Sequence, residues 1–104
     1  MSYKLPIGAT PTHTFELPFE VATIKAAEIV YKQHGEIILT KALESCKCDK
    51  NILTLKLTQE ETFLFDENST VSMQMRVLRE DGEVIPSDPI ILVPCKCLSG
   101  KVLS

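Results

Sequence analysis

The stretch that decides the fold is Ile52-Leu53-Thr54-Leu55-Lys56-Leu57, in which leucine alternates with threonine and lysine. Successive side chains of a β-strand point to opposite faces, so the alternation places these leucines together on one face. The pattern therefore predicts a strand with one buried and one exposed face. A second alternation follows over residues 71–78, where valine and methionine occupy every second position up to Val77.

Two segments extend the β pattern toward the N-terminus. Residues 12–17 alternate threonine and glutamate with larger, less polar side chains, which predicts a half-buried strand. Residues 23–33 are ambiguous, because their apolar positions also fit a helical stripe. We predict a strand, because Gln33-His34-Gly35-Glu36 has the composition of a turn and the β-rich run Ile37-Ile38-Leu39 follows it.

Turn and cap signals separate these segments. Asp49-Lys50-Asn51 precedes the leucine strand, and Gly82 lies where a hairpin turn needs positive φ. Thr58 and Glu61 have the spacing of a capping box, which predicts a short helical turn after the leucine strand. Such a turn would place Phe63 or Phe65 under the sheets.

These signals predict an all-β fold, an immunoglobulin-like β-sandwich of about seven antiparallel strands. The chain has no tryptophan, so the buried Trp of antibody domains is absent. We divide the chain into an N-terminal arm at residues 1–11, a sandwich domain at residues 12–98 and a flexible C-terminal tail at residues 99–104.

Charge and hydropathy limit the partners. The net charge is −3 and the 11 basic residues are scattered, which argues against nucleic acid, because binding to phosphates needs clustered Lys and Arg. No apolar run approaches the roughly 20 residues of a membrane span. The N-terminus also lacks the apolar segment of a signal peptide, so we expect a cytosolic start and reduced cysteines.

The most unusual feature is a repeated Cys-Lys-Cys motif, at Cys46, Cys48, Cys95 and Cys97. Residues i and i+2 of a strand point the same way, so two such motifs on neighbouring strands could present four thiolates to one zinc ion. The usual zinc spacing is Cys-x₂-Cys, so the motif leaves two alternatives open. The cysteines could instead be unpaired thiols, or form disulfides after release from the cell.

The sequence predicts no enzyme and no cofactor. His13 and His34 lie in different contexts, and neither belongs to a recognisable nucleophilic motif. The acidic pairs Glu60-Glu61 and Asp66-Glu67 lack the spacing of a calcium loop, and charge in turns is usually solvated. The glycines are isolated, so no phosphate-binding loop is present.

Four segments between residues 10 and 98 carry a resemblance to a known family. They are Thr10-Pro11-Thr12-His13-Thr14-Phe15, Val30-Tyr31-Lys32-Gln33-His34-Gly35, Leu57-Thr58-Gln59-Glu60-Glu61-Thr62, and Met75-Arg76-Val77-Leu78 with the stretch from Asp81-Gly82 to Ser87-Asp88. In these segments the chain resembles small prophage-encoded structural proteins and the N-terminal immunoglobulin-like domain of phage baseplate (upper baseplate or receptor-binding) proteins.

The resemblance implies a docking component of a tailed-phage tail or baseplate, made in the bacterial host cytoplasm and then built into the virion. Its expected partners are other phage structural proteins, with symmetric homo-oligomers and no nucleic acid or membrane. The arm at residues 1–11 would add to the sheet edge of a neighbour. The alternative hypothesis is a small zinc-binding or thiol module that uses the two Cys-Lys-Cys motifs.

Overall fold

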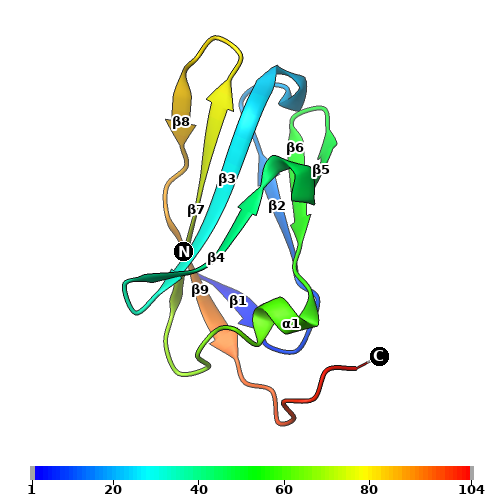
Figure 1. The fold of residues 1–104 in the computed structure, drawn as a ribbon, viewed down its shortest axis with the longest axis vertical. Coiled ribbons are helices and arrows are strands. Elements are labelled where there is room, and N and C mark those ends of the chain that lie inside the picture. The colour runs from blue at the N-terminus through cyan, green and yellow to red at the C-terminus, as the bar shows by residue number, and fades with distance from the viewer. Residues whose placement is uncertain (1, 104) are drawn as a thin grey trace.

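Two β-sheets face each other in the computed structural model, which describes residues 2–103 (Figure 1). The larger sheet has the order β1-β9-β7-β3-β4, with β8 also paired to β7, and the smaller has the order β2-β6-β5. The predicted immunoglobulin-like β-sandwich is confirmed. The elements are β1 (Ser2–Pro6), β2 (Thr12–Glu16), β3 (Ile24–Gln33), β4 (Glu36–Ala42), β5 (Cys46–Asp49), β6 (Ile52–Lys56), α1 (Gln59–Thr62), β7 (Val71–Arg79), β8 (Val84–Pro86) and β9 (Ile90–Cys95), with 3₁₀ turns at Val21–Thr23 and Leu43–Ser45.

The core lies between the sheets and is built from the alternating strands. Leu53 and Leu55 of β6 and the following Leu57 are fully buried. The inward side chains of β7 pack against them from the other sheet. Val77 is the last residue of β7 that belongs to the core. This alternation of buried and exposed positions is what a strand with one solvent-facing side requires.

The ambiguous segment at residues 23–33 is a strand, as predicted. β3 pairs with β4 and β7 and lies inside the larger sheet. The turn after it needs left-handed backbone angles, with φ of 55° at His34 and 75° at Gly35. Gln33 is buried and its side-chain amide bonds the backbone of Asp66 and Ser69, which ties this turn to the loop before β7.

The predicted capping box is present at α1. Glu61 N–H donates to Thr58 Oγ1 at 3.2 Å, and Thr58 N–H donates to Glu61 Oε1 at 2.9 Å. The short helix brings Phe65 into the core, where its ring centroid lies 5.9 Å from that of Tyr31.

The prediction of an N-terminal arm outside the sandwich domain is wrong. Residues 2–6 form β1, which pairs in parallel with β9 at the edge of the larger sheet. Leu5 is fully buried and Ile7 is 6% exposed, so burial of these side chains holds the segment in its own sandwich. The described residues therefore form nine strands, one pair of them parallel, where about seven antiparallel strands were predicted.

Residues of the predicted tail are hydrogen-bonded to the domain, and Leu103 is bonded to the side chain of Gln59. Gln59 donates to the Leu103 carbonyl at 3.0 Å and accepts from Leu103 N–H at 2.9 Å. The predictions for Met1 and Ser104 lie outside the described residues. Among residues 2–103, no helix is long and apolar enough to cross a membrane.

Candidate thiol site

The two Cys-Lys-Cys motifs lie in different sheets. Cys46 and Cys48 belong to β5, the edge strand of the smaller sheet, whereas Cys95 ends β9 in the larger sheet and Cys97 follows it. The premise of neighbouring strands is therefore wrong, since β5 pairs only with β6 among the described strands. In the part of the chain that the structure describes, no three His, Cys, Asp or Glu side chains are grouped to hold a metal ion.

Cys46 and Cys48 share one face of β5. Their register partners on β6 are Leu55 and Leu53, both fully buried, so both thiols point toward the space between the sheets. Cys46 is half-buried against the core, and its Sγ lies 3.7 Å from the Ala42 carbonyl oxygen.

The Cys46 thiol is held in its protonated form. Burial raises its pKa, the charges of Cys48 and Glu44 raise it further, and Lys41 partly opposes them. A cation that binds both would release a proton from the thiol pair.

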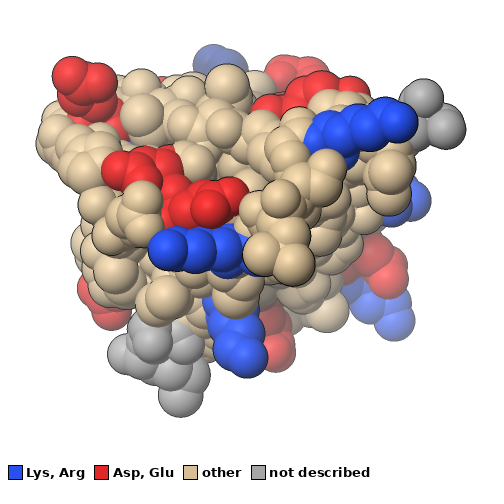
Figure 2. All heavy atoms as spheres, turned by 90° about the horizontal axis from the view of Figure 1, so that it is seen from below, with Lys and Arg blue, Asp and Glu red and all other residues tan. Residues whose placement is uncertain are grey.

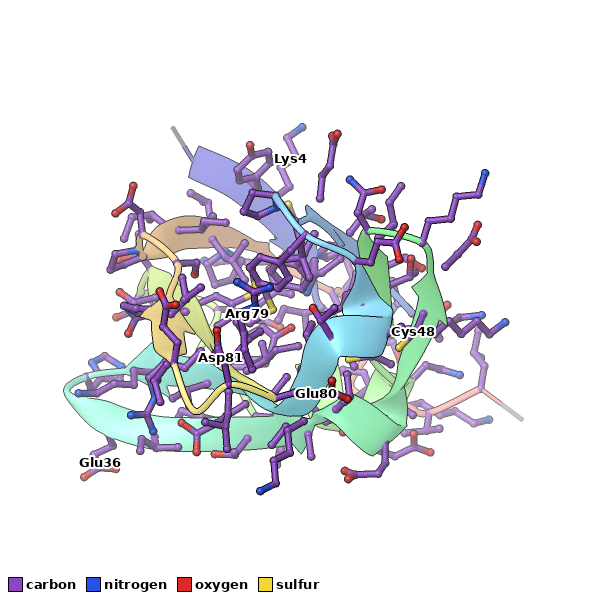
Figure 3. All side chains as sticks on the ribbon, turned by 90° about the horizontal axis from the view of Figure 1, so that it is seen from above. Lys4, Glu36, Cys48, Arg79, Glu80 and Asp81 are labelled. Atoms are coloured by element: carbon purple, nitrogen blue, oxygen red, sulfur yellow. The ribbon has the colours of Figure 1, made fainter. Side chains whose placement is uncertain are left out.

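Cys48 is the accessible member of the pair. It is exposed and lines a hollow of about 310 Å³ together with Glu20, Val21, Ala22 and Lys50. Figure 3 shows it beside β5. Cys48 is therefore the more exposed of the two thiols, and Cys46 is partly exposed as well.

The second motif does not form a matching pair. Cys95 is the last residue of β9, and Cys97 lies past the strand, where its Sγ donates to the Ser99 carbonyl at 2.8 Å. The Cys97 side chain packs against the core close to Gly8. Because Cys97 lies outside the strand, Cys95 and Cys97 are not placed on one strand face as Cys46 and Cys48 are.

His13 contacts Tyr31, and the sequence does not predict this contact. Its Nδ1 lies 2.7 Å from the Tyr31 hydroxyl oxygen, and its Nε2 is buried and has no hydrogen-bond partner among the residues that the structure describes. Burial lowers the pKa of His13, so the ring is neutral near pH 7. Burial also raises the pKa of Tyr31, and the charges of Cys46 and Glu61 add to the effect. The alternation of β3 indicates that Tyr31 is buried, but nothing in the sequence pairs it with His13.

The remaining charged candidates are part of local structure. His34 Nε2 lies 2.9 Å from Asp66 Oδ2 on the surface. Glu61 belongs to the capping box and also pairs with Lys41. Figure 2 shows acidic and basic side chains interspersed over the lower face, so no single sign of charge dominates there.

No family model matches the chain, and no curated protein matches it. Among solved structures, it is similar to the crystal structure of CopC from Methylosinus trichosporium OB3b. The TM-score is 0.55 and the sequence identity is 16%, over 93% of this chain and 90% of that chain.

This similarity overturns the resemblance to phage proteins. The expected role as a phage tail or baseplate component is wrong, because the fold agrees with that of CopC over 93% of the chain. The segments that carried the resemblance contain turns and strand starts, whose composition many β-sandwiches share. The expected phage partners and virion location rested on that resemblance alone.

Proposed function

We propose that this protein is a non-enzymatic module that binds copper(I) as cargo through Cys46 and Cys48. The observation that carries the proposal is that both thiols project from the same face of the edge strand β5, one half-buried and one exposed. Thiolates are soft ligands that select copper(I), zinc and iron–sulfur clusters.

The number of available ligands favours copper(I) over zinc. Structural zinc sites take four protein ligands in a tetrahedron, and the described residues contain no group of even three. Copper(I) forms stable complexes with two thiolates, so a Cys-x-Cys pair on one strand face meets its requirement. The proposal therefore replaces the four-cysteine zinc hypothesis by a two-cysteine copper site.

The fold similarity supports the same metal. CopC is a copper-resistance protein, and its architecture extends over most of this chain. The similarity concerns the fold alone, so the proposal rests on the thiol pair and on the number of ligands that it offers.

The residues around the pair would tune metal affinity. Burial keeps Cys46 protonated in the free protein, so copper(I) must displace a proton there, and affinity is expected to rise with pH. Cys48 would receive the ion first because it is exposed, and Cys46 would then complete the coordination at the border of the core.

The test is an anaerobic copper(I) titration of the full chain against a chromophoric chelator, with native mass spectrometry to count bound ions. We expect one copper(I) per chain, and loss of this binding in Cys46→Ser and in Cys48→Ser. The matched control is the double variant Cys95→Ser/Cys97→Ser, which should bind like the wild type. Unchanged binding in both single variants would refute the proposal, as would loss of binding in the control with circular dichroism unchanged.

A further inference from the structure

The strand β5 has a free edge. It is the outer strand of the smaller sheet, and among the described strands it pairs with β6 alone (Figure 1). No backbone hydrogen bond outside the sheet involves Lys47, Cys48 or Asp49 among residues 2–103, and all three residues are exposed. An edge strand presents backbone N–H and C=O groups that can pair with another strand. This edge is therefore accessible to a second chain.

Thiols and charges alternate along β5. Cys46 and Cys48 project from the face directed toward the space between the sheets, and Lys47 and Asp49 project from the opposite face. Neither Lys47 nor Asp49 belongs to an ion pair within the part of the chain that the structure describes. The outer face of the strand thus carries a cation and an anion, two positions apart, that are both available to a partner.

Charge selects one register for an antiparallel pair of two β5 strands. Directly opposite residues share a face, so a two-fold symmetric pair of identical strands is centred on one residue. A centre at Lys47 or at Asp49 places like charges opposite each other, which is unfavourable. A centre at Cys46 would pair the strand with the 3₁₀ turn Leu43–Ser45. A centre at Cys48 places each Lys47 opposite the Asp49 of the second copy, so both ion pairs are satisfied.

The same register joins the two thiol pairs. Cys48 then lies opposite Cys48 of the second copy, where opposite Cβ atoms are about 4.5–5.5 Å apart. Cys46 lies on the same face and is the diagonal neighbour of that second Cys48, at roughly 7–8 Å. Four thiols therefore form one cluster across the paired strands.

We propose that two copies of this chain pair antiparallel through β5 and share copper(I) between their two Cys46–Cys48 pairs. The inference rests on the proposed copper(I) function and names the partner of that site as a second copy. A four-residue strand is far smaller than the roughly 20–30 residues per partner of a stable interface, so pairing without metal is weak. Copper(I) held by both copies stabilises the dimer, because a ligand that binds only one state shifts the equilibrium toward it.

The test measures oligomeric state and bound copper(I) of the full chain, by sedimentation velocity and native mass spectrometry in anaerobic, reducing solution. We expect a monomer without metal and, after loading, a dimer with two copper(I) ions. A copper(I)-loaded monomer at every protein concentration would overturn the inference and leave the proposed function intact. Absence of copper(I) binding would refute the proposed function, and the inference with it.

Charge variants locate the interface. Lys47→Glu places acidic residues opposite each other and Asp49→Lys places lysines opposite each other, so each variant alone should bind copper(I) as a monomer. An equal mixture of the two variants should recover the dimer, because every acidic residue then faces a lysine.

The matched control is Lys56→Glu, which makes the same change of charge at an exposed position of β6, a strand that is already paired on both sides. It should dimerise with copper(I) like the wild type. The inference would be overturned if either β5 variant alone dimerised like the wild type, if the mixture stayed monomeric, or if the control lost the dimer.

Discussion

Gly8 illustrates how a single residue joins two distant parts of the chain. Its φ of 82° lies in the left-handed region, and its N–H donates to Thr62 Oγ1 at 2.9 Å. A Cβ at this position would lie 3.0 Å from Cys97 Sγ and 3.3 Å from the Phe63 ring. Gly8 therefore allows the loop after β1, the helix α1 and the segment after β9 to meet.

Replacement of Gly8 by alanine is expected to destabilise the fold through both effects. The left-handed angle costs about 1–2 kcal/mol for a residue with a Cβ, and the close contacts add to this cost. Urea unfolding measures the loss. Gly82→Ala is the matched control, because its φ is 89° but no atom of the other described residues lies within 4 Å of the new Cβ. Equal losses in the two variants would show that the contacts contribute nothing.

His13 makes stability depend on pH. Its pKa is lowered from 6.5 by burial, so below pH 6.5 the unfolded chain binds a proton that the folded chain does not. This contribution to stability is fully present above pH 6.5 and is lost as the pH falls below it. We expect the urea midpoint to decrease from pH 7.5 to pH 5.5.

The matched variants for this prediction are His13→Gln and His34→Gln. His13→Gln should flatten the pH dependence between pH 7.5 and pH 5.5, while His34→Gln, at an exposed turn, should keep it. In this range Asp66 and Glu61 stay ionised, because their pKa values lie below 3.8 and 4.5. If the pH dependence of stability persists in His13→Gln, another titrating group causes it.

At the scale of elements, β1 shows that an edge strand can belong to the core. Among the described strands it pairs with β9 alone, yet Leu5 is fully buried between the sheets. We expect Leu5→Ala to destabilise the protein by about 2–5 kcal/mol, the usual cost of a large-to-small change in a core. Lys4→Ala, at an exposed position of the same strand, should change the urea midpoint little. A small effect of both variants would mean that β1 is detached in solution.

At the scale of the whole molecule, stability should vary across the larger sheet. Within residues 2–103, the central strands β3 and β7 each pair on both sides, whereas β1 pairs with β9 only. Native-state hydrogen exchange should therefore show faster exchange of β1 amides than of β3 and β7 amides. Leu5→Ala should accelerate exchange in β1 more than in the central strands. Equal protection of all three strands would indicate that the sandwich opens only as one unit.

The sequence alone determined the strands that alternate regularly, because period-two alternation is local. The leucines of β6, the valines and methionines of β7 and the capping box at Thr58 all appear in the structure where the pattern predicts them. β1 was missed, because Ser2–Pro6 shows little periodicity and its burial depends on β9, at the other end of the chain.

Only the tertiary structure decided the candidate sites. The Cys-x-Cys spacing places Cys46 and Cys48 on one strand face, but the pairing of strands separates them from Cys95 and Cys97. The contact of His13 with Tyr31 likewise joins residues that no local pattern relates. A local pattern specifies which face a side chain occupies, whereas the partner across the core depends on how the sheets pack, which involves the whole chain.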